Sequence, residues 1–373
     1  MDIVGFLISW ITLFSIYSIL SISLNLEAGY TGISNFGKAA FYGIGAFIAA
    51  VVSLLVFLTL SGLSYPLYSL ETIVSMGTLS KQNPALNILV FLLTVVLAFI
   101  ISGIAGYLVS YPTLRVGPAF LGITVLSFGE LLRIFLRNFQ PTCGTYGLAG
   151  IPHPFAFVQD PTTRDLAFML VALTVLIAVY LFSEKLVNSP YGRLMKSIRE
   201  DEVASLCLGK DVPKIKAQVL FIGSGMAGIA GALLAYYMGS INPDIFIPSL
   251  TFEVWAMVIF GGSANNKGAL LGAGVITFLN RASVMLNFMF QNLPIDVNYI
   301  RWMLVGLLIV ATLLFKPEGL IPEDTKSSFV WSLVGEQKAV SFKDKAEEVG
   351  KRVKLYVKKL INWFMMGLSL IHI

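Results

Sequence analysis

The apolar stretch LNILVFLLTVVLAFIISGIAGYLV, residues 86–109, decides the class of fold. It contains no charged residue and exceeds the roughly 20 residues that an α-helix needs to cross the hydrocarbon core of a bilayer. The rest of the chain has the same character, because 56% of its 373 residues are hydrophobic and 13% are charged. A soluble domain carries roughly 25% charged residues. The sequence therefore predicts a polytopic membrane protein and excludes a water-soluble fold.

We expect an all-α protein with about nine transmembrane helices, and eight or ten are the alternatives. Two Gly- or Pro-rich stretches, around 35–45 and 243–262, are the candidates for broken or re-entrant helices. The first span lacks a basic start and a small-residue cleavage pattern, which favours a membrane helix over a signal peptide. The candidate spans are 3–24, 36–60, 86–109, 119–138, 165–183, 217–238, 245–262, 268–288 and 299–315.

Lys and Arg are concentrated in two segments, seven in 184–216 and ten in 316–359. Because positively charged loops stay in the cytoplasm, both segments should be cytoplasmic, with the N-terminus outside and the C-terminus inside. The tail is basic and amphipathic and is expected to lie on the anionic lipids of the inner leaflet. The expected organisation is a first transmembrane bundle (1–183), a cytoplasmic loop (184–216), a second transmembrane bundle (217–316) and a cytoplasmic tail (317–373).

Residues 25–47, NLEAGYTGISNFGKAAFYGIGAF, interrupt the apolar pattern with repeated glycines and with Glu27 and Lys38. Unwound backbone at membrane depth is tolerated only where protein or a water-filled cavity surrounds it. Two interpretations stay open. The segment is either a broken helix whose backbone groups meet a polar solute, or an ordinary loop and helix start with glycine at the turns.

Glu130 and Arg133 are spaced i, i+3 in the span 119–138, so they lie on one face of a helix. Ionisable residues within a span are costly and often mark function. A structural ion pair between packed helices is nevertheless the favoured interpretation over a contact with solute. The candidate residues for a solute path are Tyr30, Thr31, Gly32, Ser34, Gly37, Gly43, Gly45 and Glu130.

The loop 184–216 predicts two short amphipathic helices. Ser189 followed by Pro190 is typical of a helix start, Gly209 is placed to end the second helix, and Asp211 is placed to begin the next span. Apolar side chains alternate there with mixed charges, which is typical of a segment that lies on the membrane or docks into a groove on another protein. A solvated loop is the alternative.

Small residues recur four apart in several spans, which permits close approach of helix backbones. The clearest stripe consists of Gly223, Ala227, Gly231 and Ala235. Helix packing is the favoured interpretation over a subunit interface or a pore lining.

The sequence contains no phosphate-binding loop, because Gly37-Lys38 and Gly209-Lys210 are followed by Ala and Asp. Neither His153 nor His372 has a spacing that would hold a metal. No enzymatic activity, cofactor, metal or nucleic-acid partner is therefore expected. The residues themselves leave two classes open, a permease driven by ATPases on separate chains and an ion-coupled secondary transporter.

Several motifs are specific in combination, and they occupy 23–47, 120–133, 147–154, 189–209 and 261–274. Together they resemble the permease subunits of branched-chain amino acid ABC importers, the Liv-type permeases, a family that also includes urea and short-chain amide transporters. The broader importer coupling motif is incomplete here, and Lys38 stands where the family often has His. The tail after about residue 325 is outside the resemblance.

The resemblance implies a multi-pass permease of a prokaryotic plasma membrane that imports branched-chain or related amino acids, with urea or amides as the alternative. It implies a homologous second permease, two ABC ATPase subunits and an extracytoplasmic substrate-binding protein as partners, besides the membrane lipids. The residues that would contact the ATPase are Arg193, Ile198, Arg199, Glu200, Asp201, Glu202, Ala204, Leu206, Leu208 and Gly209.

Overall fold

The computed structural model describes residues 3–62, 69–113, 118–289 and 297–323. These belong to one structural unit, which ends at Glu323. Most of the expected basic tail, from residue 324 onward, lies outside the described residues.

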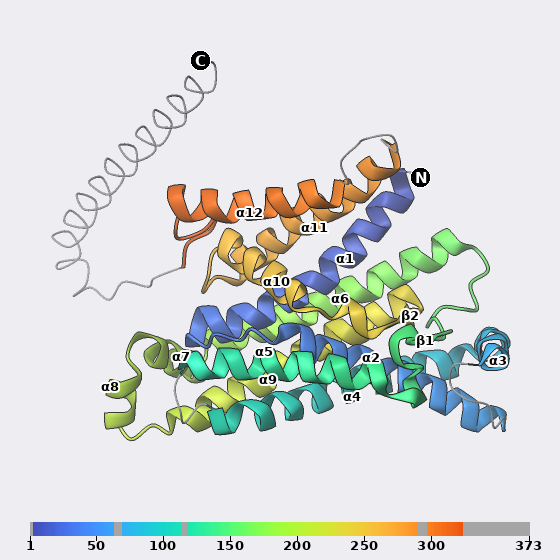
Figure 1. Ribbon diagram of the computed structural model, residues 1–373, viewed down its shortest axis with the longest axis horizontal. Coiled ribbons are helices and arrows are strands. Elements are labelled where there is room, and N and C mark those ends of the chain that lie inside the picture. The colour runs from blue at the N-terminus through green and yellow to red at the C-terminus, as the bar shows by residue number, and fades with distance from the viewer. Residues whose placement is uncertain (1–2, 63–68, 114–117, 290–296, 324–373) are drawn as a thin grey trace, which may run out of the picture. The chain divides into compact units, whose positions relative to one another are not determined.

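The described chain is a bundle of α-helices (Figure 1). Its two short strands, β1 (Leu148–Ala149) and β2 (Ser240–Ile241), pair in antiparallel fashion. Short helices are η1 (Asn25–Gly29), η2 (Gln140–Thr142), η3 (Gly144–Tyr146) and η4 (Pro243–Ile245). The α-helices are α1 (Ile3–Leu24), α2 (Lys38–Ser61), α3 (Leu70–Gln82), α4 (Pro84–Thr113), α5 (Pro118–Asn138), α6 (Pro161–Asn188), α7 (Pro190–Glu200), α8 (Glu202–Cys207), α9 (Val212–Met238), α10 (Pro248–Gly261), α11 (Asn266–Met289) and α12 (Val297–Phe315).

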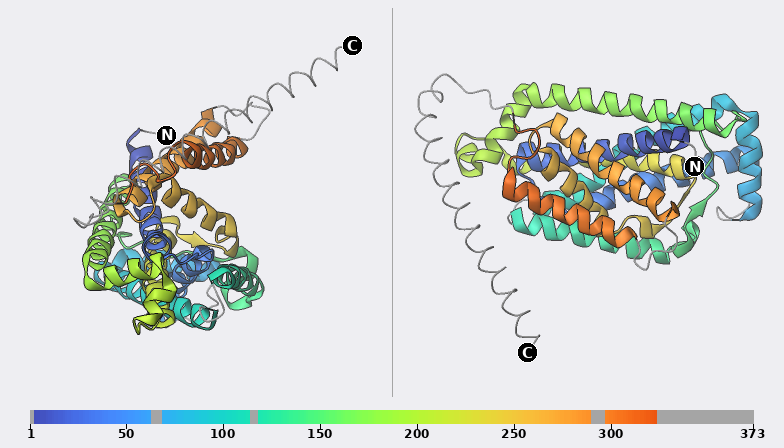
Figure 2. Two further views of the ribbon diagram at one scale, coloured as in Figure 1. Left: turned by 90° about the vertical axis from the view of Figure 1, so that its left-hand side faces the viewer. Right: turned by 90° about the horizontal axis from the view of Figure 1, so that it is seen from above.

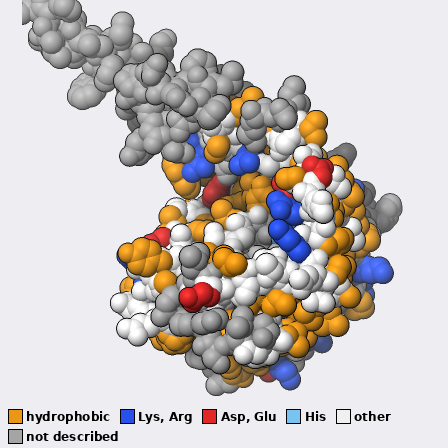
Figure 3. Space-filling view, turned by 90° about the vertical axis from the view of Figure 1, so that its right-hand side faces the viewer, with side chains coloured by type: hydrophobic (Ala, Val, Ile, Leu, Met, Phe, Trp, Pro, Cys, Tyr) orange, Lys and Arg blue, Asp and Glu red, His pale blue; other side chains and the backbone are white. Residues whose placement is uncertain are grey.

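The all-α membrane class predicted from the sequence is confirmed. Each candidate span coincides with one helix, and within the described residues seven helices are long and apolar enough to cross a membrane. The remaining two are α5, which carries Glu130, Arg133 and Arg137, and α12, whose described apolar part is short. Figure 3 looks onto the end of the bundle at which α3 lies and shows hydrophobic side chains with separate groups of Lys, Arg, Asp and Glu side chains between them.

Helix α3 was not predicted from the sequence. It lies across one end of the bundle, and α7 and α8 lie at the opposite end (Figures 1 and 2). The Ser69 side chain caps α3 by accepting a hydrogen bond from the Thr72 N–H. Glu71 and Lys81 occupy the first and last turns of α3. These signals were present in the sequence, but the segment is too polar to resemble a span.

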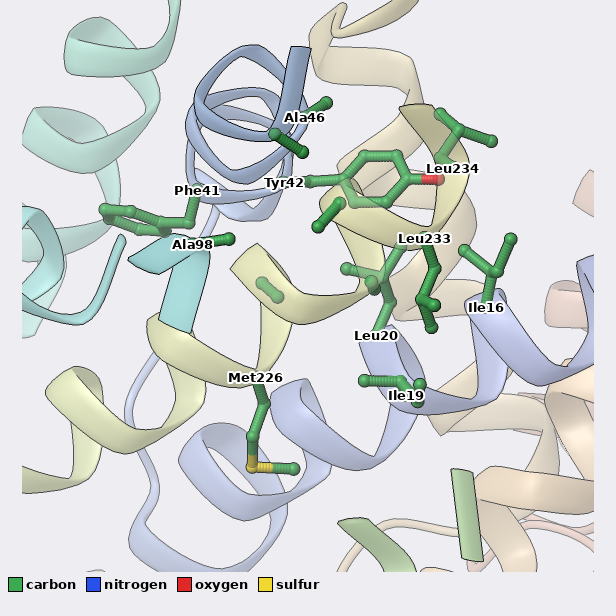
Figure 4. Packing of buried hydrophobic residues seen from close by; sticks show 14 of the residues in the cluster. Ile16, Ile19, Leu20, Phe41, Tyr42, Ala46, Ala98, Met226, Leu233 and Leu234 are labelled. Carbon is green, nitrogen blue, oxygen red and sulfur yellow. The ribbon is translucent and has the colours of Figure 1, made fainter. Parts of the chain in front are cut away.

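Helix α9 is the centre of the packing, in contact with α1, α2 and α4. Figure 4 shows Leu233 and Leu234 of α9 beside Tyr42 of α2 and Leu20 of α1. A Cβ at Gly231 would overlap the carbonyl oxygen of Tyr42. The small-residue stripe of α9 thus packs against helices of the same chain at this point.

We expect Gly231→Ala to destabilise the protein by about 1–3 kcal/mol, because a methyl group must enter a backbone contact that has no room for it. Gly77→Ala is the matched control, since Gly77 lies inside α3 with open space around it and alanine favours helix by up to about 1 kcal/mol. Thermal unfolding of both variants in detergent measures the difference. Equal melting temperatures would contradict the assigned packing.

Candidate functional site

The first helix breaks inside the bundle. After Leu24 the chain widens into the π-helix η1, and residues 32–37 follow as irregular backbone before α2 begins at Lys38. A Cβ at Gly29 would lie 2.5 Å from the Ala264 backbone nitrogen, so glycine permits this close approach. Helical structure thus continues through η1 to Thr31, only 32–37 are unwound, and 38–47 is regular helix. The structure locates the interruption, and a contact of this segment with solute stays a prediction.

Glu27 and Lys38 form an ion pair across this break. Lys38 Nζ lies 2.8 Å from Glu27 Oε1, and both side chains are 0% exposed. Asn35 Nδ2 donates to Glu27 Oε2 at 2.9 Å, and the Asn35 side-chain oxygen accepts from the Gly37 N–H. The sequence had singled out both charged residues without pairing them. Because desolvating two charges is expensive, the pair is stable here only through this geometry and its additional hydrogen bond.

Asn25, in the same π-helical turn, connects the break to the second half of the chain. Its Oδ1 accepts from the Ala264 N–H at 2.8 Å, and its Nδ2 donates to Asn266 Oδ1 at 3.0 Å. Asn266 Nδ2 in turn donates to Glu184 Oε1 at 3.2 Å. The turn is thereby fixed to the α10–α11 connection and to the end of α6. Sequence reasoning missed the contacts among these two side-chain amides and one carboxylate, since their spacing carries no local signal.

The solute-path candidates lie in the broken segment, in α2 and in α5. Tyr30 and Thr31 are buried in the broken segment, where Gly32 is exposed and Ser34 is half-buried. Three glycines instead lie against neighbouring elements. A Cβ added at Gly37 would meet Val125 of α5, and one added at Gly43 would meet Phe246 after η4. A Cβ added at Gly45 would meet the Gly228 backbone of α9. Glu130 lies on α5, which packs against α2.

The expected ion pair of Glu130 and Arg133 is confirmed, and it extends to a third residue. Arg133 Nη2 lies 2.8 Å from Glu130 Oε2, and Arg133 Nη1 lies 2.9 Å from Asp244 Oδ1 on η4. Glu130 is 33% exposed, so the pair faces the surface of the described unit. Asp244 was missed because it is 111 residues from Arg133 in sequence.

The loop 184–216 forms the two expected short helices. Ser189 Oγ accepts from the N–H groups of Tyr191 and Gly192 to start α7, and Asp201 Oδ1 accepts from the Ala204 N–H at 2.9 Å to start α8. Gly209 follows α8 with φ +74°, a backbone conformation that favours glycine. The predicted start of α7 at Ser189 and the predicted end of the second helix at Gly209 are confirmed, whereas the cap at Asp201 was not predicted.

The two helices face different environments. Helix α7 buries Met195 and Ile198 against the bundle. Helix α8 and its end expose Val203, Leu206 and Leu208, and Leu208 is 78% exposed. Lys216 Nζ lies 2.6 Å from Glu202 Oε2 and ties α8 to the start of α9.

Glu323, which follows α12, forms ion pairs with two side chains of α7. Its carboxylate lies 2.8 Å from both Lys196 Nζ and Arg199 Nη2, and Arg199 also pairs with Glu200. Burial alone would lower the pKa of Arg199, but the hydrogen bonds and charges of Glu200 and Glu323 raise this pKa above its ordinary value. Arg199 therefore stays charged at any physiological pH.

The sequence that forms this broken first segment and the α7–α8 pair is similar to that of known proteins. The family described as "Branched-chain amino acid transport system / permease component" matches residues 6–313. The chain belongs to this family. The resemblance stated from the motifs is thereby confirmed, and the protein is a multi-pass membrane protein of the permease class.

Similar members come from distant organisms. The chain is 32% identical over 338 residues to "Probable branched-chain amino acid transport permease protein LivM" of Methanocaldococcus jannaschii, covering 86% of this chain and 94% of the relative. It is 28% identical to "High-affinity branched-chain amino acid transport system permease protein LivM" of Escherichia coli, covering 83% and 69%. It is 23% identical to the LivH permease protein of the same system and organism, covering 83% and 94%. No solved structure matches the chain.

Proposed function

We propose that this chain is the permease subunit of an ATP-driven importer for branched-chain amino acids. Relatives named LivM and LivH both match it, and the names of those from Escherichia coli describe permeases of a high-affinity branched-chain amino acid transport system. A second permease of the same family is therefore the first partner that we propose. ATPase subunits on separate chains and an extracytoplasmic binding protein complete the proposed importer, in which this chain conducts the solute and hydrolyses nothing.

The observation that carries the ATP-driven reading is the exposed apolar surface of α8. Val203, Leu206 and Leu208 are exposed, and the charged residues Lys210 and Asp211 follow soon after Leu208. Glu200 and Asp201 stand beside them and are also exposed. A buried apolar centre with a charged rim is the usual anatomy of a protein interface. We propose that this surface docks on an ATPase subunit.

The solute path is proposed to pass along the partly exposed side of the broken segment, toward the second permease. Support comes from Gly32 and Ser34, which are accessible in unwound backbone, and from Glu130, which is partly exposed on α5. Polar backbone groups and charges at membrane depth belong beside protein or water rather than lipid. Gly37 and Gly45 lack this support, because neighbouring helices cover them.

Nine crossings with the N-terminus outside and the C-terminus inside remain the proposed topology. In support, the weakly basic connection that contains Gln159 leads into one end of α6, and the basic α7–α8 pair follows its other end. In a Cys143→Ser background, we expect Cys207, which is native and exposed, to react with an impermeant maleimide only after the cells are permeabilised. A cysteine placed at the exposed Gln159 in a background that lacks both native cysteines, Cys143→Ser with Cys207→Ser, should react in intact cells. Labelling of Cys207 in intact cells would reverse the orientation.

The function itself is tested by reconstitution. The chain, its second permease, the ATPases and the binding protein should be purified together and placed in liposomes, and uptake of labelled leucine should be measured with and without ATP. Leucine uptake that requires ATP and is not reduced by excess urea supports the proposal. Uptake of urea alone would reassign the substrate, and uptake driven by a proton gradient without ATP would replace the mechanism.

A further inference from the structure

Arg199 reaches from α7 into the broken first helix. Its Nη1 donates a hydrogen bond of 2.7 Å to the carbonyl oxygen of Gly29, 170 residues earlier in the chain. The neighbouring carbonyls of Glu27 and Ala28 accept backbone N–H groups from Ile33 and Gly32. The carbonyl at the end of η1 is thus held by the guanidinium group of the cytoplasmic loop.

The backbone around this hydrogen bond packs closely on α7. A Cβ at Gly32 would lie 3.3 Å from Cγ of Arg199, and Gly32 has φ +73°. Lys196, one helical turn earlier on α7, places its Nζ 5.4 Å from the centre of the Tyr30 ring. Helix α7 therefore contacts the broken segment through two side chains, and a displacement of α7 must move or break these contacts.

The turn that Arg199 holds is also the turn that anchors other elements. Glu27 joins it to Lys38 at the start of α2, and Asn25 joins it to Ala264 in the α10–α11 connection. Both anchors are buried, and both lie within four residues of Gly29. One short π-helical turn thus receives a contact from the loop and passes contacts to both halves of the bundle.

We infer that Arg199 is a positioning residue that transmits the displacement of α7 and α8 to the Asn25–Gly29 turn, and from there to α2 and the α10–α11 connection. This inference rests on the proposed function, since it requires an ATPase that moves α8. Arg199 then acts inside the permease, where it is 23% exposed, rather than as part of the charged rim that meets the ATPase. Arg199 bonds directly to the last carbonyl of the π-helical turn, at 2.7 Å, so a displacement of α7 acts on the turn itself.

The test is the number of ATP molecules hydrolysed per solute imported by the complete reconstituted transporter. Arg199→Ala should leave ATPase subunits bound and hydrolysis close to wild type, but lower transport so that the ratio rises about tenfold, within the usual range of coupling energies. Lys214→Ala is the matched control, because Lys214 is an exposed cation at the start of α9 whose side chain has no ion-pair partner within the described part of the chain. It should leave the ratio unchanged.

A purely structural role for Arg199 predicts a different result. Hydrolysis and transport would then fall together with the melting temperature, and an unchanged ratio in Arg199→Ala would overturn the inference. Where that variant is obtained in low yield, Arg199→Lys keeps the charge beside Glu323 but cannot bond Glu323 and Gly29 together, and its ratio should also rise. An unchanged ratio in a well-folded Arg199→Lys variant overturns the inference too.

Glu323→Ala separates the two contacts of Arg199. It removes the carboxylate but leaves the hydrogen bond to Gly29, so its ratio should stay near wild type; a rise equal to that of Arg199→Ala would overturn transmission through Gly29. Absence of ATP-dependent transport in the wild-type assembly would instead refute the proposed function. If the inference fails but the proposed function holds, the wild-type assembly transports normally and the Arg199 variants hydrolyse the same number of ATP molecules per solute as the wild type.

Discussion

Lys38→Met is expected to destabilise the permease by about 3–5 kcal/mol, because it leaves the Glu27 carboxylate charged and unpaired in the interior of the bundle. Asn35 supplies one hydrogen bond to that carboxylate and cannot replace the lost positive charge. Yield in detergent and the midpoint of thermal unfolding measure the effect. A change below about 1 kcal/mol would show that solvent or lipid headgroups reach Glu27, against the burial described above.

The matched double variant shows whether charge or shape is responsible. Glu27→Gln combined with Lys38→Met removes both charges and keeps similar volumes, so it should recover most of the lost stability, as neutral replacements of buried pairs often do. Arg164→Ala is the control, since it breaks an exposed pair with Asp165 and should cost less than about 1 kcal/mol. A double variant as unstable as Lys38→Met would mean that packing around Lys38, rather than its charge, holds the segment.

Features that depend on neighbouring residues were predictable from the sequence. The caps formed by Ser189 and Asp211 and the i, i+3 pair of Glu130 with Arg133 each lie within a few residues of one another, and the structure confirms them. The positions of the long helices were predictable for the same reason, because apolar length alone determines a membrane span.

Features that join distant segments could not be predicted in this way. Asn25 and Asn266 are 241 residues apart, and Arg199 and Gly29 are 170 residues apart. A residue pattern indicates that a polar group needs a partner but does not indicate which of many distant groups will satisfy it. The same limit explains why the hydrogen bond of Arg199 to Gly29 was not predicted, although Arg199 was among the residues expected to contact the ATPase.

The second large effect is expected at the exposed end of α8. Leu208→Asp should weaken binding of the ATPase by at least about 2 kcal/mol, roughly 30-fold, because a charge would enter the apolar centre of the proposed contact. The fold itself should tolerate the change within about 0.5 kcal/mol, since Leu208 is exposed and lies after the last helical residue of α8. Transport should fall with the bound ATPase, while pairing with the second permease persists.

Controls for this substitution come from the same loop. Leu208→Met keeps an apolar side chain of similar size and should bind the ATPase normally, and single charge reversal of the exposed Glu200 should cost less than about 1 kcal/mol. The measurements are co-purification of the ATPase and ATP-dependent uptake. Loss of binding distinguishes Leu208→Asp from Arg199→Ala, which should bind the ATPase but uncouple ATP hydrolysis from transport. If Leu208→Asp binds and transports at wild-type levels, α8 is not the docking surface, and the ATP-driven mechanism loses the structural observation that carries it.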